Sequence, residues 1–267
     1  MGAGFRSPAK IARRLKLTPL AARKVASWPR FMCNYALGLV PDTPYEFRNH
    51  ALLKIGRGVD HVPIIEIFLR EDYGAVADGA IILDLGANIG AFSVYAAMSA
   101  RDVTVYAYEP MTDFYRLMQE NVLINRLNGT VKCFNLAVAA NAQSRALFVA
   151  GRDIFFPTFV APPDDQADTV DVMCTTLADI CDSNGLERVD LLKMDCEGAE
   201  YEILYSTPAV YFERIREIRM EYHNLSGEGR NVDALATFLR GKGYAIMLSQ
   251  AASAQQASGN LWARKHD

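Results

Sequence analysis

Three carboxylates fall within six residues at the point where a buried strand is predicted to end. Asp195, Glu197 and Glu200 follow residues 189–194, which read as a buried strand. Acids this close repel one another, so a solvated surface would normally space them apart. The group suits a base that takes a proton, a clamp for substrate hydroxyls, or ligation of a hard metal ion through oxygen. Glu200 has an alternative role, because an acid in the first turn of a helix is stabilised by the helix dipole.

His223 closes a second strand-like run, 218–223. Neighbouring parallel strands end at the same edge of a sheet, so we expect His223 to lie near Asp195. An imidazole with its ordinary pKa near 6.5 can take a proton at neutral pH. His223 is therefore a candidate for catalysis or substrate binding, and Glu221 is a weaker one. Lys193 precedes the acids in their strand and is available to pair with one of them.

A glycine-rich turn lies directly between a predicted strand and a predicted helix, at residues 84–90. Gly86 and Gly90 allow a tight turn and let backbone amides approach a ligand closely. A dinucleotide-binding fingerprint has a glycine where this turn has Asn88, and here Asp84 precedes the turn. The pattern therefore favours a ligand without phosphates, carrying an amino acid and a nucleoside, over NAD. Asp84 can meet the ammonium group of such a ligand, directly or through water.

An acid at the end of the following strand supports a nucleoside ligand. Glu109 lies 23 residues beyond Gly86, where a carboxylate can accept hydrogen bonds from both ribose hydroxyls. The residues predicted to bind the cofactor are Asp84, Gly86, Asn88, Gly90, Glu109, Pro110 and Asp195.

Three runs in the sequence, DLGANIGAFSVYAA, YAYEP and LLKMDCEGAEYEIL, together resemble the FkbM-type methyltransferases over roughly residues 80–223. The resemblance implies S-adenosylmethionine as methyl donor and O-methylation of a hydroxyl on a sugar, a glycan or a complex natural product. Asp195, His223 and Glu197 are then the expected catalytic residues. We expect turnover without added metal; if a divalent metal were bound, its ligands would be Asp195, Glu197 and Glu200.

Strand and helix signals alternate along residues 76–267, which we interpret as a single S-adenosylmethionine-binding domain. The pattern predicts an α/β, Rossmann-like fold, and the resemblance implies the class I methyltransferase form of it. That form has a mostly parallel seven-stranded sheet with helices on both faces. One helix is expected to be capped by Thr112 or Asp113 and to stop at Gly129. Residues 1–75 are expected to form a basic N-terminal helical extension that acts as a substrate lid.

Charge is distributed unevenly along the chain. Residues 1–41 hold eight basic residues and no acid, while the remainder has a net charge of −11. The basic segment either docks on the acidic body or makes weak peripheral contact with anionic lipid. We expect no transmembrane segment, no nucleic-acid partner, and a small-molecule or glycan acceptor. Five scattered cysteines without CxxC spacing favour free thiols in the cytoplasm.

Two other functions share these features. A nicotinamide-dependent oxidoreductase has the same fold, but the interrupted glycine motif disfavours it. A non-catalytic nucleoside-binding scaffold remains an alternative, because fold alone does not fix function. Residues 28–75 and 150–168 are expected to contact the acceptor, and they carry no recognisable motif.

Overall fold

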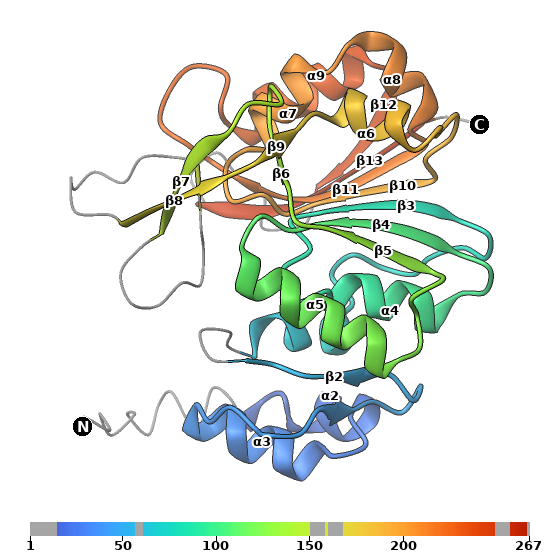
Figure 1. Ribbon diagram of the computed structural model, residues 1–267, viewed down its shortest axis with the longest axis vertical. Helices are drawn as coiled ribbons and strands as arrows, with labels where there is room; N and C mark the ends of the chain where they lie inside the picture. The colour runs from blue at the N-terminus through green and yellow to red at the C-terminus, as the bar shows by residue number, and fades with distance from the viewer. Residues whose placement is uncertain (1–14, 57–60, 150–157, 160–167, 249–256, 266–267) are drawn as a thin grey trace.

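A seven-stranded sheet forms the centre of the molecule, in the order β12-β13-β11-β10-β3-β4-β5 (Figure 1). The computed structural model describes residues 15–56, 61–149, 158–159, 168–248 and 257–265. The five strands from β11 to β5 are parallel, and β13 and β12 continue the sheet antiparallel to their neighbours. These strands are β3 (Ile81–Leu85), β4 (Thr104–Tyr108), β5 (Val131–Phe134), β10 (Leu191–Met194), β11 (Glu217–His223), β12 (Tyr244–Leu248) and β13 (Ser258–Lys265).

Helices cover both faces of this sheet (Figure 1). One face packs against α4 (Ala91–Ser99) and α5 (Thr112–Ile124). The other carries α6 (Leu177–Ser183), α7 (Glu200–Ser206), α8 (Ala209–Arg214) and α9 (Val232–Gly241). The predicted α/β, class I methyltransferase-like fold with a mostly parallel seven-stranded sheet is confirmed.

Local chemistry explains where two of the helices begin and end. The Asn231 side chain accepts a hydrogen bond from the Ala234 N–H and caps α9. Helix α5 spans Thr112–Ile124 with Met111 at its N-cap position and no side-chain cap, so the expected cap at Thr112 or Asp113 and the expected stop at Gly129 are both wrong. Asn125 accounts for the earlier end, because its amide nitrogen donates to the carbonyls of Asn121 and Leu52.

The N-terminal extension packs beyond α4 and α5, on the side away from the sheet (Figure 1). It contains α2 (Thr18–Lys24), α3 (Trp28–Leu37), the antiparallel pair β1 (Tyr45–Glu46) and β2 (Leu52–Leu53), and η1 (Ile64–Arg70). The element η1 is a π-helix. This form is rare in proteins, but where it occurs it is often at a functional site. Phe47 stacks on Phe68 of η1 with ring centroids 3.8 Å apart, within the same apolar core that contains α4 and α5.

Two smaller pairs of strands flank the main sheet. They are the parallel pair β6 (Ala137–Val138) with β9 (Cys174–Thr175) and the antiparallel pair β7 (Arg145–Val149) with β8 (Asp168–Val172). Most of the segment 150–168, and residues 1–14 of the basic N-terminus, lie outside the described residues. Within the described ranges, every helix is too short or too polar to cross a membrane.

Candidate active site

The order of the strands in the sheet reverses between β3 and β10: β4 and β5 follow β3 on one side, and β10 and β11 lie on the other. The carboxyl ends of β3 and β10 lie side by side at this point. In open α/β sheets, ligands bind at the carboxyl ends of the strands at such a point. Leu85 of β3 pairs with Met194 of β10, so the chain leaves the two strands side by side at Gly86 and Asp195. A Cβ atom on Gly86, whose φ is +71°, would lie 1.8 Å from the Asp195 carbonyl oxygen. Glycine is therefore required here by the neighbouring backbone.

Glu109 is buried beside this turn and holds its backbone in place. One of its carboxylate oxygens accepts from the Asn88 N–H and the other from the Met111 N–H, both at 2.8 Å. Asn88 lies in the left-handed region, with φ +51°. Burial raises the pKa of Glu109 to about 7, although these two hydrogen bonds and the charge of Lys193 act in the opposite direction. Each oxygen keeps a second lone pair that can accept from a ligand hydroxyl.

Asp84 and Lys193 form a buried ion pair beneath the turn. The Lys193 ammonium lies 3.1 Å from Asp84 Oδ1 and donates to the Gly86 carbonyl at 2.8 Å. Asp84 also accepts from the Ser93 hydroxyl at 2.6 Å. Burial lowers the pKa of Lys193, but the charges of Asp84 and Asp195 and the hydrogen bond to Asp84 together outweigh it, so the pKa is raised. Lys193 therefore does pair with an acid, while Asp84 supports the turn from below and is absent from the described lining of both cavities above it.

Two cavities open above the turn, and they share Gly86, Asn88, Phe114, Asp195 and Glu197 in their walls. The first, called here the Glu109 cavity, is also lined by Tyr108, Glu109, Pro110, Ala137, Val138, Leu147, Phe159, Cys196 and Ala199. The second, the acidic cavity, has a volume of about 300 Å³. Its wall also includes Val62, Pro63, Glu66, Ile67, Tyr73, Ala87, Ala91, Lys193, Glu221, His223 and Ser258.

Gly90 lies away from both cavities. Its φ is +76°, and a Cβ atom there would lie 2.8 Å from the Met118 side chain of α5. This glycine therefore allows α4 and α5 to pack closely. Pro110 lines the Glu109 cavity, and the Asn135 amide donates to its carbonyl at 2.8 Å.

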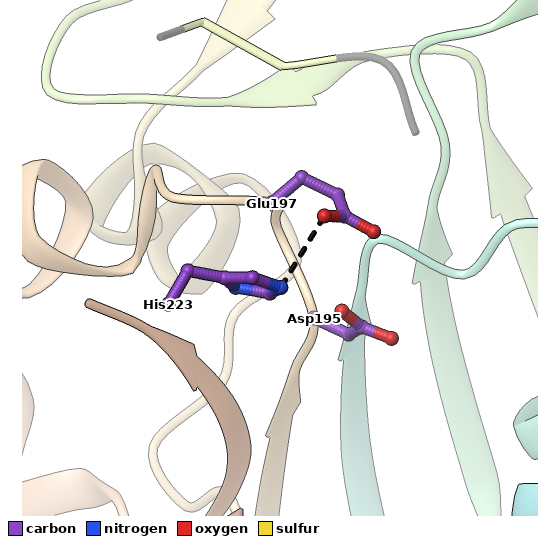
Figure 2. Close-up of side chains that lie close together, drawn as sticks. All are labelled: Asp195, Glu197 and His223. Carbon is purple, nitrogen blue, oxygen red and sulfur yellow. Dashed lines mark ion pairs between the residues drawn. The ribbon is translucent and has the colours of Figure 1, made fainter. Parts of the chain in front are cut away.

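Asp195, Glu197 and His223 converge beyond the ends of β10 and β11 (Figure 2). His223 Nε2 lies 3.3 Å from a carboxylate oxygen of Glu197. Asp195 Oδ2 accepts from the Tyr73 hydroxyl at 3.4 Å, while Asp195 Oδ1 is buried without a hydrogen-bond partner. Glu197 has a φ of +49°, an uncommon conformation for a residue with a side chain. The structure thus brings together the three residues predicted to be catalytic.

Glu200 faces His223 from the other side of the ring. It is fully buried, and one of its oxygens accepts from His223 Nδ1 at 3.1 Å and from the N–H groups of Cys196 and Gly198. Among the described residues, the set of three side chains whose potential ligand atoms lie within 4.8 Å of one another is Asp195, Glu197 and His223. The third member of this set is therefore His223, whereas the sequence suggested Glu200 as the third potential ligand of a metal.

The surrounding carboxylates favour positive charge on His223. Burial lowers its pKa, but the hydrogen bond and charge of Glu200 and the charges of Glu197 and Asp195 raise it to about 10. These carboxylates therefore favour the positively charged imidazolium, whereas the sequence suggested an ordinary pKa near 6.5. Burial raises the pKa of Glu197 to about 8, with a further contribution from Asp195.

Two residues of the acidic cavity come from the range 28–75 that was expected to contact the acceptor, but neither was identified individually. Tyr73 contacts Asp195 as described, and Glu66 projects from the π-helix η1. Burial, followed by the charges of Glu221 and Asp195, raises the pKa of Glu66 to about 8. Both residues lie more than 120 positions before Asp195, so no local pattern could have identified them.

Comparisons with known proteins show the family of the chain. The chain matches the methyltransferase FkbM domain over residues 84–246, more than half of its length. It is 26% identical to the methyltransferase sdnD of Sordaria araneosa, covering 73% of this chain and 85% of that protein. It is 25% identical to the 31-O-demethyl-FK506 methyltransferase FkbM of Streptomyces tacrolimicus, covering 64% and 75%.

A solved structure of the methyltransferase FkbM from Methylobacillus flagellatus KT has a TM-score of 0.49 and 15% identity, covering 96% of this chain and 60% of that one. The match to the family domain spans the glycine turn, Glu109 and the cluster at the ends of β10 and β11. The chain is therefore a methyltransferase and belongs to the FkbM family.

Proposed function

We propose that this protein transfers a methyl group from S-adenosylmethionine to a hydroxyl of a sugar, a glycan or a complex natural product. The observation that carries the proposal is the pair of cavities that meet at Gly86 and Asp195. One holds a buried carboxylate suited to ribose hydroxyls, and the other gathers acids around a histidine. A donor in the first and an acceptor in the second would meet at the shared wall.

The Glu109 cavity suits the nucleoside of the donor. Its wall is largely apolar, which favours a planar base, and Glu109 offers free lone pairs to the ribose hydroxyls. Asn88 and Asp195 lie where the cavities join, beside the expected place of the amino-acid part and the sulfonium.

The acceptor hydroxyl belongs in the acidic cavity, near Asp195, Glu197 and His223. In the reaction the acceptor oxygen forms a bond to the methyl carbon as the carbon–sulfur bond breaks, and the hydroxyl proton leaves to a carboxylate of the cluster. Holding the oxygen in line with that bond is the main contribution a protein makes to such a step. A hydroxyl acceptor also agrees with the name of the FK506-related relative, which specifies methylation at an oxygen.

We also propose that the N-terminal extension covers the acceptor. Val62, Glu66 and Tyr73 contribute to the wall of the acidic cavity, so the part of residues 1–75 nearest the site would contact whatever binds there. The reaction is assigned to the cytoplasm, because all five cysteines are free thiols, which suits a reducing compartment.

The test combines binding with turnover. Calorimetry of the purified protein should show binding of S-adenosylmethionine and none of NAD. Release of S-adenosylhomocysteine is then measured over a panel of glycosides, polyols and natural-product alcohols, with primary amines as the comparison class. A hydroxylated product heavier by one CH₂ would support the proposal. Binding of NAD in place of S-adenosylmethionine would indicate an oxidoreductase, and donor binding without turnover on any acceptor would indicate a non-catalytic scaffold.

A further inference from the structure

We propose that Asp195, Glu197 and His223 bind one divalent cation of the Mg²⁺ or Mn²⁺ class, whose remaining positions take oxygens of the acceptor. The ion site is inferred from the side chains alone, and only its role toward the acceptor rests on the proposed function. From the sequence we expected turnover without added metal and, if a metal were bound, Glu200 as its third ligand. The present proposal differs on both points, because the structure places His223 beside Asp195 and Glu197.

The separations of the three side chains suit a single ion. Their potential ligand atoms all lie within 4.8 Å of one another, and His223 Nε2 lies 3.3 Å from Glu197 Oε2. Around an octahedral ion with ligands at about 2.1 Å, adjacent ligand atoms are about 3 Å apart and opposite ones about 4.2 Å. Small side-chain rotations therefore bring all three onto one ion.

A second observation is the unpartnered oxygen of Asp195. Its Oδ1 atom is buried and has no hydrogen-bond partner, and Asp195 lines both cavities. Asp84 Oδ1 and Glu200 Oε2 also have no hydrogen-bond partner, but neither residue is among the described residues that line the two cavities. Buried carboxylate oxygens are almost always paired, so an unpartnered one in a cavity wall calls for a specific explanation. A cation bound between Asp195 and Glu197 provides the missing partner.

Glu200 supplies the support that a metal-binding histidine normally has. Such histidines usually donate their other ring N–H to a carboxylate or carbonyl, which fixes the orientation of the ring. Glu200 is fully buried and accepts from His223 Nδ1 at 3.1 Å, leaving Nε2 toward Glu197. A bound cation would take the place of the proton on Nε2, because a histidine ligand binds as the neutral imidazole. Two backbone N–H groups hold the same Glu200 oxygen. Glu200 is thus a positioning residue for the site.

The charge of the acidic cavity also favours a cation. Its described wall contains four carboxylates, Glu66, Asp195, Glu197 and Glu221, against Lys193 and His223. The Lys193 ammonium is already committed to Asp84 and to the Gly86 carbonyl. Two carboxylates and one imidazole leave open positions, unlike the closed four-ligand sets of structural zinc.

A cation at this place would hold the acceptor oxygen and stabilise the negative charge that develops on it as its proton leaves. Open positions on the ion favour an acceptor that offers two adjacent oxygens, such as a vicinal diol of a sugar. The inferred acceptor is therefore a chelating polyol.

Binding of Mn²⁺ to the purified protein, freed of metal by dialysis against a chelator, tests the site without any acceptor. The electron paramagnetic resonance signal of free Mn²⁺ measures the bound fraction. We expect one ion per chain, with affinity at least tenfold weaker in Glu197→Gln and His223→Ala. Glu200→Gln should weaken Mn²⁺ affinity by about tenfold or more, because Glu200 acts only by positioning the His223 ring. Asp113→Asn, an exposed acid on α5, is the matched control and should bind like the wild type.

Melting temperatures on the same preparations exclude unfolding, and Asp195→Asn serves if His223→Ala does not fold. Absence of Mn²⁺ binding to the wild type, or equal affinity in all variants, would overturn the proposal. Calorimetry with S-adenosylmethionine separates this outcome from the proposed function. Donor binding without Mn²⁺ binding removes only the ion site, whereas Mn²⁺ binding without donor binding removes only the proposed donor.

Discussion

The two cavities that meet at Gly86 are built on opposite principles. In the Glu109 cavity the carboxylate of Glu109, the residue that distinguishes it, has both oxygens bonded to backbone N–H groups. In the acidic cavity four carboxylates crowd together and Asp195 keeps a buried oxygen unpaired. The Glu109 carboxylate is thus already hydrogen-bonded within the protein, and this cavity suits a neutral, largely apolar group. The acidic cavity suits a ligand that brings a positive charge or a hydrogen-bond donor to its carboxylates.

This contrast predicts different consequences for changes in the shared turn and in each cavity. A change at the turn should damage both cavities, a change in the acidic cavity should affect chemistry, and a change at Glu109 should affect donor binding.

The largest effect is expected for Gly86→Val. Its Cβ would lie 1.8 Å from the Asp195 carbonyl oxygen, and φ is +71°, so the ends of β3 and β10 must separate. We expect a loss of about 4 kcal/mol or more in the free energy of unfolding, with no measurable donor binding. Thermal unfolding and calorimetry check this. Gly129→Ala is the control, since a Cβ there meets nothing within 4 Å; similar behaviour of the two variants would refute the packing argument.

The next largest effect is expected for Asp195→Asn and His223→Ala. His223 lines only the acidic cavity, and Asp195 lies in the wall that the two cavities share. We expect S-adenosylmethionine affinity to stay within a few-fold while kcat falls by about 10²-fold or more. Glu197→Gln should show a similar loss, with a larger share in the acceptor KM. Normal kcat in a folded Asp195→Asn protein would remove that residue from the catalytic set. Glu213→Gln, at an exposed position on α8, is the control.

Glu109→Ala should weaken S-adenosylmethionine binding by about 1–3 kcal/mol, because it removes the acceptor for the ribose hydroxyls. It also leaves the N–H groups of Asn88 and Met111 unpaired. Glu109→Gln retains part of that support and separates the two contributions. The acceptor KM should not change, and calorimetry together with steady-state kinetics measures both. Unchanged donor affinity in both variants would place the nucleoside elsewhere.

The pH dependence of donor binding follows from the same residue. The pKa of Glu109 is raised to about 7 by burial, with Asp84 adding to this and Lys193 opposing it. Only the ionised carboxylate accepts from both ribose hydroxyls, so affinity should fall as pH decreases through 7. It should be roughly tenfold weaker at pH 6 than at pH 8. Glu109→Gln should remove most of this dependence; equal slopes in the two proteins would contradict the assignment.

The sequence predicted the parts of this molecule that local pattern determines. Apolar runs identified β3, β4 and β10, and the glycine turn marked the edge where they end. It did not predict why Gly86 is glycine, since the reason is a backbone contact with Asp195. It did not predict the pairing of Asp84 with Lys193 either, because the sequence associated Lys193 with the acids that follow it in the chain.

Long-range contacts explain the remaining differences. The end of α5 is set by Asn125, whose side chain bonds to Leu52, 73 positions earlier. Glu66 and Tyr73 reach the acidic cavity from an extension in which only helices were expected. The raised pKa of His223 depends on Glu200, 23 positions away, whose orientation is fixed only by the fold. The catalytic and cofactor-binding roles themselves remain predictions.

The smallest effect is expected for Tyr73→Phe, and it tests how far the extension contributes to the acidic cavity. The Tyr73 hydroxyl donates to Asp195 Oδ2 at 3.4 Å, a long contact. Burial raises the pKa of Tyr73 well above its usual value, so the hydroxyl remains a donor at all working pH values. Removing it should lower kcat by a few-fold, in line with about 0.5–1.5 kcal/mol for one hydrogen bond. Donor affinity and melting temperature should be unchanged, because the ring keeps its packing against Phe92. Tyr205→Phe removes a hydroxyl that bonds to the Gly229 carbonyl outside both cavities, and it should leave kcat unchanged. A kcat loss equal in the two variants would show that the extension only packs against the site and does not act on Asp195.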